Sequence, residues 1–163
     1  MGFSIAEAAR DAGGLVSIIS GPVNLETPNE VDRINVESAD EMLKEVDKAV
    51  NNFDLFISTA AVSDFKPEEY ENQKIKKQKK ANNLNLELIK NQDILKSVSE
   101  NKGDLKVIGF AAETQNIIEN AKKKLKEKNL DLIIANDVSD DSIGFDSDEN
   151  EVYLITKKNR KKN

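Results

Sequence analysis

The stretch KVIGFAAETQNIIENAKKKLKEKNLDLIIAN, residues 106–136, contains two apolar runs separated by a helical pattern. The runs 106–112 and 131–136 are rich in Val, Ile, Leu and Ala, which is typical of strands that are covered on both faces of a parallel sheet. Within 114–129, Ile118, Ala121 and Leu125 recur at helical spacing. A strand, a helix and a second strand in this order predict a parallel βαβ unit.

The same alternation continues toward both ends of the chain. Further predicted strands cover 15–20, 53–59 and, more weakly, 151–156, and further predicted helices cover 38–52 and 91–103. Ser38 and Glu41 have the spacing of a capping box at the start of the helix in 38–52. We therefore predict an α/β fold with a Rossmann-like, doubly wound and mostly parallel sheet. Ligands of such sheets bind beyond the carboxyl ends of the strands.

The chain opens on a helical pattern rather than on a strand. Apolar side chains recur at helical spacing in residues 1–14, and the pattern ends at Gly13 and Gly14. A Rossmann-like fold normally begins with a strand and a glycine-rich turn that holds phosphate at a helix N-terminus. We therefore expect the first strand and the phosphate loop to be missing from this chain.

Length and composition limit the classes of function. A chain of 163 residues suits a single domain, which we assign to residues 1–163. Neither Cys nor His is present, which excludes disulfides, thiolate chemistry and every Ser/His or Cys/His catalytic arrangement. No apolar run approaches the ~20 residues of a membrane span, and the start does not resemble a signal peptide. We expect a cytoplasmic protein with no membrane partner.

A lysine-rich segment follows the predicted strand 53–59. DFKPEEYENQKIKKQKK, residues 64–80, has five lysines in its last seven positions, although the formal net charge of the chain is -6. A solvated surface loop is the ordinary interpretation of such a run. We instead predict a mobile active-site loop at 64–90 that carries Lys74 over the end of that strand, onto a phosphate. The acidic chain lacks interleaved aromatic residues, so nucleic acid is a disfavoured partner.

Three further patterns leave their interpretation open. Lys124 and Lys128 share a helix face, although solvated lysines are the default there. In GFAAET (109–114), Phe110 suits a core position and Glu113 suits a turn as well as a site. The acidic stretch 134–150 does not meet the Asp, Gly and Glu spacing of a calcium loop, so calcium binding is disfavoured.

The order of several motifs resembles that of phosphopantothenoylcysteine synthetase, usually the C-terminal half of the bifunctional flavoprotein of bacterial coenzyme A biosynthesis. The motifs are SGPVNLETP (20–28), AAVSDFKP (60–67), KIKK (74–77), KNQDIL (90–95), GFAAET (109–114), NLDLIIANDVS (129–139) and GFDSDENEVYLI (144–155). The resemblance covers residue 1 to about 156. Together the motifs are specific, whereas a single one such as GFAAET is not.

The resemblance implies a reaction and its partners. The family joins 4'-phosphopantothenate to cysteine with CTP, through an acyl-cytidylate and with release of pyrophosphate. It implies Mg2+ as cofactor, CTP as co-substrate and a homodimer whose interface lies close to the site. It implies no flavin in this chain, because the flavin-dependent decarboxylase half is absent.

The resemblance also implies site residues. The backbone of Ser58, Thr59 and Ala60 is expected to meet the nucleotide, with Asp64 as a contacting carboxylate. Lys74 is expected to be the catalytic loop lysine that helps to form the acyl-cytidylate. The remaining implied nucleotide contacts are Asn91, Gln92, Asp93, Ile94, Phe110, Lys124 and Lys128. Gln92 departs from the family pattern KNPDI, where proline is usual.

Two alternatives to a complete ligase stay open. The resemblance implies that the asparagine holding the acyl-cytidylate precedes Met1, so we expect this chain to be a truncated fragment that is incomplete on its own. A module that binds CTP without releasing pyrophosphate is the first alternative. A nicotinamide-dependent oxidoreductase is the second, suggested by the fold alone. The chain has no G-x-G-x-x-G motif to support that second alternative.

Overall fold

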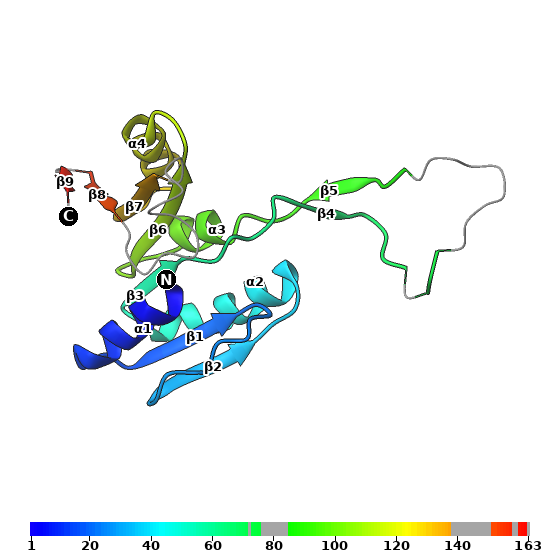
Figure 1. Ribbon diagram of the computed structural model, residues 1–163, viewed down its shortest axis with the longest axis horizontal. Coiled ribbons are helices and arrows are strands. Elements are labelled where there is room, and N and C mark those ends of the chain that lie inside the picture. Colours follow the sequence, from blue (N-terminus) through cyan, green and yellow to red (C-terminus); the bar gives the residue numbers. More distant parts are fainter. Residues whose placement is uncertain (72, 76–84, 138–150, 158–159, 163) are drawn as a thin grey trace.

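A computed structural model describes residues 1–71, 73–75, 85–137, 151–157 and, for the backbone, 160–162. Its main sheet has the order β3-β6-β7-β8-β9 (Figure 1). The strands are β3 (Leu55–Ser58), β6 (Lys106–Glu113), β7 (Leu132–Asp137), β8 (Val152–Thr156) and β9 (Arg160–Lys162). β3, β6 and β7 are parallel, whereas β8 and β9 are antiparallel to their neighbours. The predicted mostly parallel α/β fold and its βαβ unit are confirmed.

A separate pair of strands lies beside this sheet. β1 (Val16–Ser20) and β2 (Val31–Asn35) are parallel, with Val16 opposite Val31. The predicted strand at 15–20 is confirmed. β2 was not predicted, because its sequence VDRIN carries two charged side chains and has no continuous apolar run. Its single buried residue, Val31, leaves little pattern to recognise.

The described residues form four α-helices and a short 3-10 turn, of which α1 precedes the first strand. They are α1 (Gly2–Asp11), α2 (Ala39–Ala49), η1 (Val50–Asn52), α3 (Ile94–Glu100) and α4 (Ile117–Glu127). The Ser38 hydroxyl accepts a hydrogen bond from the backbone N–H of Glu41, so the predicted cap of α2 is confirmed. The Glu41 carboxylate accepts from the backbone N–H of Glu37 rather than from that of Ser38. None of the described helices is long and apolar enough to cross a bilayer.

The core lies between β6, β7, α3 and α4. Val107, Ala121, Leu130 and Ile133 are almost completely buried there. Gly109 belongs to the same region, where an added Cβ atom would lie 2.8 Å from a methyl carbon of Leu95 and 2.9 Å from one of Leu130. An added methyl group would therefore have to displace these side chains, so close packing around β6 favours glycine at this position of the GFAAET motif.

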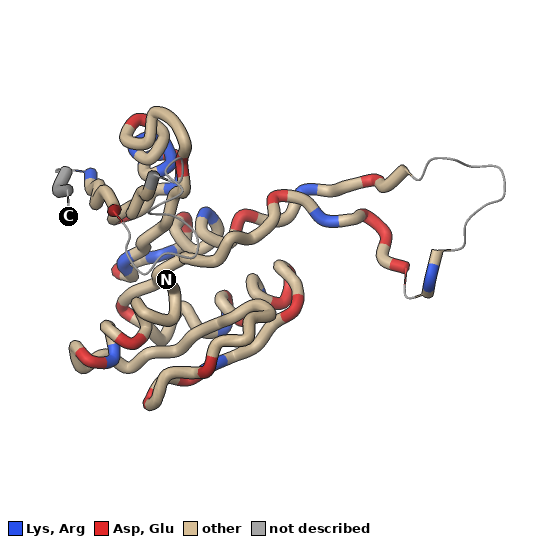
Figure 2. Tube along the Cα trace, viewed as in Figure 1, with Lys and Arg blue, Asp and Glu red and all other residues tan. Residues whose placement is uncertain are grey.

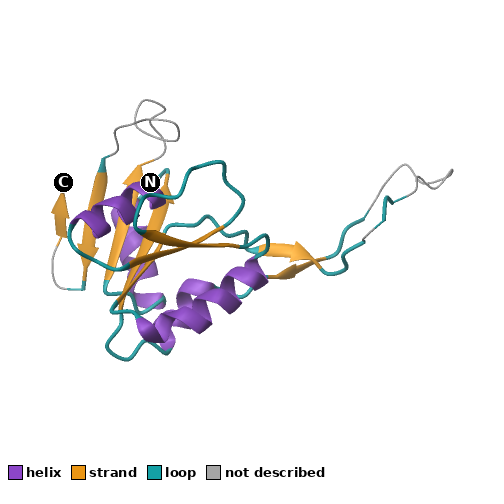
Figure 3. Cartoon of the chain, turned by 90° about the horizontal axis from the view of Figure 1, so that it is seen from below, coloured by secondary structure: helices purple, strands orange, loops and turns teal. Residues whose placement is uncertain are grey.

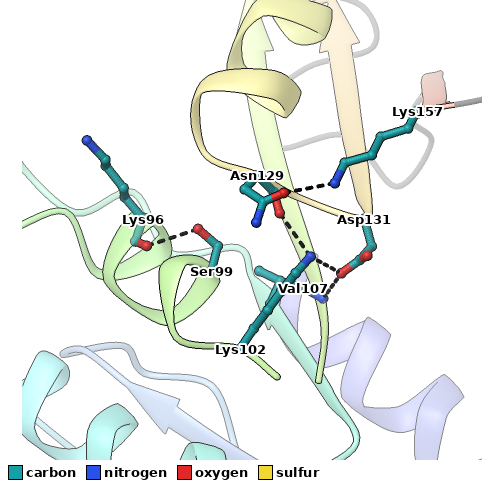
Figure 4. A network of polar contacts seen from close by, with 7 residues as sticks. All are labelled: Lys96, Ser99, Lys102, Val107, Asn129, Asp131 and Lys157. Atoms are coloured by element: carbon teal, nitrogen blue, oxygen red, sulfur yellow. Dashed lines mark hydrogen bonds and ion pairs between the residues drawn. The ribbon is translucent and has the colours of Figure 1, made fainter. Parts of the chain in front are cut away.

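A network of polar contacts connects the amino ends of β6 and β7 (Figure 4). One carboxylate oxygen of Asp131 accepts hydrogen bonds from Lys102 Nζ at 2.7 Å and from the Val107 backbone N–H at 2.9 Å. Partial burial of Asp131 raises its pKa, but these donors outweigh that effect, so the pKa lies below its ordinary value. Lys102 also donates to the carbonyl of Asn129, which has a left-handed φ of 47°. The network joins the turn after α4 to two strands of the sheet.

A narrow two-stranded arm leaves the body of the molecule between β3 and α3 (Figures 1 and 3). It is built from β4 (Phe65–Pro67) and β5 (Leu88–Lys90), which pair antiparallel with Phe65 opposite Lys90. Acidic and basic residues are distributed along both sides of the arm (Figure 2). These two short strands lie within 64–90, the segment that was predicted to be a loop. The described residues at the two ends of this segment instead pair as an antiparallel two-stranded ribbon.

Candidate functional site

The parallel strands β3, β6 and β7 present their carboxyl ends at one edge of the main sheet. Ser58 ends β3 and lies opposite Gly109, and Glu113 ends β6. Thr59 is half-buried and Ala60 is exposed just beyond β3. An added Cβ atom on Gly2 would lie 2.7 Å from Thr59 Oγ1, so the first turn of α1 packs against the same edge. The structure therefore places the predicted segment Ser58, Thr59 and Ala60 where ligands of this fold class bind.

Hydrogen bonds of Asn91 join the two sides of the arm at its base, beside this edge. Its backbone N–H donates to the carbonyl of Asp64 at 2.8 Å, and its Nδ2 donates to the carbonyl of Ser63 at 2.8 Å. The side chain is buried, and its Oδ1 atom has no hydrogen-bond partner among the described residues. Gln92 follows as an exposed residue. The arm thus brings the predicted residues Asp64 and Asn91 together through the backbone, and the Asp64 side chain is exposed.

Asp93 links the start of α3 to α4. Its Oδ1 atom accepts from the backbone N–H of Lys96 at 3.0 Å, which caps α3, and its Oδ2 atom lies 2.8 Å from Lys128 Nζ. Partial burial of the Asp93 carboxyl raises its pKa, but the hydrogen bonds from Lys128 and Lys96 outweigh it and lower the pKa overall. Ile94 is buried in the core, so only its backbone can face a ligand.

A polar stripe on α4 faces the end of β6. Asn120, Lys124 and Lys128 follow at intervals of four residues and share one helix face. Lys124 Nζ lies 2.6 Å from Glu113 Oε1, and Asn120 Nδ2 lies 3.0 Å from Glu113 Oε2. Phe110 is half-buried on β6, three residues before Glu113. Asn120 was not among the predicted site residues, although its four-residue spacing from Lys124 indicates that the two side chains share a helix face.

Lys74 is separate from the other predicted residues. Its side chain is exposed, and the segment 73–75 lies at the far end of the arm, away from the carboxyl edge of the sheet (Figure 1). The structure therefore does not bring Lys74 to Asp64 or Lys124 within this chain. The other lysines of the run at 76–80 and the acidic residues at 138–150 lie outside the described residues.

A cavity lies at the opposite edge of the sheet. Its volume is about 530 Å³, and its lining includes Asp54 and Leu105, which immediately precede β3 and β6. We place the site at the carboxyl edge instead, because the crossover connections of a doubly wound sheet open a crevice at that end of the strands. No cluster of three acidic side chains suited to a metal ion occurs in the described part of the chain.

A model of the family described as DNA/pantothenate metabolism flavoprotein C-terminal domain matches residues 1–163. The chain belongs to this family. The coenzyme A biosynthesis bifunctional protein CoaBC of Haemophilus influenzae is 48% identical over 168 residues, which cover 99% of this chain and 40% of that protein. This DNA/pantothenate metabolism flavoprotein C-terminal domain thus spans about two fifths of that relative's length.

Solved structures agree with the family assignment. The crystal structure of the C-terminal domain of a bifunctional protein CoaBC matches with a TM-score of 0.81 and 37% identity, covering 99% of this chain and 71% of that chain. A Cab2 variant in complex with phosphopantothenate-cysteine has a TM-score of 0.61 and 19% identity, covering 82% of this chain and 46% of that chain, and shares the fold. The resemblance found in the motifs is confirmed.

Proposed function

We propose that this domain carries out the CTP-dependent ligation of 4'-phosphopantothenate to cysteine in coenzyme A biosynthesis. The family and the similarity to CoaBC support this role, and the Cab2 relative of the same fold binds the phosphopantothenate-cysteine product. The observation that carries the proposal is Lys124 on α4, held at the carboxyl end of β6 by Glu113, together with Lys128 at the C-cap of the same helix, held by Asp93. A triphosphate needs fixed cations of this kind.

The proposed chemistry proceeds in two steps. A carboxylate oxygen of phosphopantothenate attacks the α-phosphorus of CTP, which forms the acyl-cytidylate and releases pyrophosphate. The amine of cysteine then attacks the acyl carbon, and CMP leaves. CTP brings about four negative charges into the site, which Lys124 and Lys128 partly offset. Mg2+ would supply further charge neutralisation, bound mainly by phosphate oxygens, with the exposed Asp64 as a candidate carboxylate ligand.

The other predicted residues have positions that suit nucleotide contacts in this proposal. The backbone of Ser58, Thr59 and Ala60 lies at the strand end where a nucleotide can approach closely. Asn91 has a buried Oδ1 atom that is unpaired within the described residues and is therefore a candidate acceptor for a nucleotide donor. Gln92 and the backbone of Ile94 continue this segment, and Phe110 presents a half-buried aromatic ring on β6.

We further propose that the domain acts as a homodimer in which the arm contacts a second copy. Exposed large apolar side chains are concentrated on the arm. They are Phe65, Tyr70, Ile75, Leu86, Leu88 and Ile89, with relative exposures of 39% to 85%. An exposed apolar surface of this extent is typical of a protein interface. Docking of the arm on a partner would deliver Lys74 to the partner's carboxyl edge, which accounts for its distance from the site in its own chain.

Calorimetric titration with CTP and Mg2+ tests the nucleotide site. We expect Lys124→Ala to weaken CTP binding about tenfold or more, because a charge-assisted phosphate contact is lost. The matched control is Lys126→Ala, on the same helix but exposed on another face, which should change the Kd by less than about twofold. ATP in place of CTP measures base selectivity. Failure of the folded wild-type chain to bind CTP would contradict the proposal.

Pyrophosphate release distinguishes a ligase from a nucleotide-binding module. The chain is incubated with CTP, Mg2+, phosphopantothenate and cysteine, and pyrophosphate and phosphopantothenoylcysteine are measured. Formation of both products supports the complete reaction. CTP binding without pyrophosphate release supports the alternative of a catalytically incomplete module.

A further inference from the structure

Glu113 is a charged group of the carboxyl edge to which the resemblance assigned no role. It is the last residue of β6, and its side chain is only 14% exposed. Its Oε1 atom accepts from Lys124 Nζ at 2.6 Å, and its Oε2 atom accepts from Asn120 Nδ2 at 3.0 Å. Because each oxygen has its own donor, the carboxylate is held in one orientation.

Asn120 holds the second oxygen of this carboxylate. The same Nδ2 atom donates to the backbone carbonyl of Gln115 at 3.0 Å, in the segment that connects β6 to α4. The amide therefore ties the connecting segment, the helix and the strand end together. Lys124 lies one helical turn after Asn120, so both donors reach Glu113 from the same helix face.

Lys124 is held but still accessible. Its side chain is 44% exposed, and its ammonium group has three N–H donors. The contact with Glu113 uses one of them, which leaves donors for phosphate oxygens. A free lysine side chain would lose rotamer freedom when it binds a phosphate, and a lysine that is already aligned loses less.

We propose that Glu113 is a positioning residue that aligns the Lys124 ammonium toward the nucleotide phosphates before the nucleotide binds, with Asn120 fixing Glu113 in turn. This inference rests on the proposed function, because the phosphate contact of Lys124 is itself proposed. In protein kinases a glutamate likewise pairs with a lysine that contacts the nucleotide phosphates.

The opposite role for Glu113 makes a different prediction. A carboxylate beside a phosphate site also repels the phosphates, so a Glu113 that merely competed for Lys124 would weaken nucleotide binding. Glu113→Gln removes the charge and keeps the size and one oxygen acceptor. Positioning predicts that this substitution weakens CTP binding about fivefold or more. Competition predicts that it strengthens CTP binding.

The test is a double-mutant cycle with calorimetric CTP and Mg2+ titration of the full chain. The variants are Glu113→Gln, Lys124→Met and the combination of both, with thermal unfolding of each measured in parallel. Because Glu113 acts through Lys124, Glu113→Gln should have almost no further effect in the Lys124→Met background. A general structural lesion would lower affinity equally in both backgrounds. Glu113→Asp keeps the charge and should retain more affinity than Glu113→Gln.

The matched charge control is Glu119→Gln, an exposed carboxylate near the start of the same helix, which should leave the Kd within about twofold of the wild-type value. Wild-type or tighter CTP binding by Glu113→Gln would overturn the inference alone, as would additive losses in the cycle. Failure of folded wild-type protein to bind CTP would overturn both this inference and the proposed function.

Discussion

The Asp93 carboxylate lies 2.8 Å from the Lys128 ammonium, although the two residues are on different helices. Asp93 is the N-cap of α3 and Lys128 is the C-cap position of α4. One carboxylate therefore both starts a helix and holds a predicted nucleotide-site lysine at the end of another. Stability and the candidate site are coupled at this pair.

Substitutions at Asp93 should separate these two roles. We expect Asp93→Ala to lower the free energy of unfolding by about 1 to 2 kcal/mol, because the cap of α3 and the ion pair are both lost. Asp93→Asn keeps a capping oxygen and should cost less. Lys128→Met removes the partly exposed ion pair alone and should cost under about 1 kcal/mol. Urea unfolding measures all three, and equal stability of Asp93→Ala and wild type would contradict the role as cap.

Asp131 should make the stability depend on acid pH. Its folded pKa lies below the ordinary value of 3.8, so its contribution is complete above about pH 4 to 5 and is lost as the pH falls through the folded pKa. We therefore expect the stability difference between wild type and Asp131→Asn to shrink between pH 5 and pH 2, with urea unfolding at each pH as the measurement. Asp104→Asn is the exposed control. A difference that stays constant with pH would contradict this linkage.

Gly109 should tolerate no larger side chain. We expect Gly109→Ala to destabilise the protein by about 1 to 3 kcal/mol, because the new methyl group would press against Leu95 and Leu130 in the core. Gly21→Ala is the matched control, since an added Cβ atom there meets no heavy atom within 4 Å. Thermal unfolding compares the two. Similar unfolding temperatures of Gly109→Ala and Gly21→Ala would contradict this prediction, because they would mean that the core around β6 accommodates the added methyl group.

The arm should decide the oligomeric state if it docks on a second copy. Leu88 on β5 is 56% exposed. We expect Leu88→Asp to convert a dimer into a monomer, because burying an unpaired charge in an apolar interface is costly. Leu15→Asp is the control, at a side chain that is 94% exposed and lies outside the arm. Sedimentation equilibrium reads out the mass. A wild-type monomer, or a dimer that persists in Leu88→Asp, would contradict the proposed contact.

The parts of the fold that were predicted correctly have strong local periodicity. β6, α4 and β7 were predicted because a buried parallel strand is apolar along its length and a covering helix repeats its apolar face every three to four residues. β2 and the arm strands β4 and β5 were missed. Their sequences are short and mostly exposed, and they exist through pairing with another strand rather than through their own pattern.

The sequence by itself determined the family and the α/β class, and it indicated the lysines of α4 as candidate site residues. Motif order and periodicity are local properties, so they can be recognised without a structure. Only the tertiary structure decided which groups those lysines meet. Glu113 and Lys124 are eleven residues apart, and Asp93 and Lys128 are on separate helices, so their contacts depend on how α3 and α4 pack on the sheet. The position of Lys74 at the end of the arm was likewise not encoded locally, because pairing of β4 with β5 directs the chain away from the body.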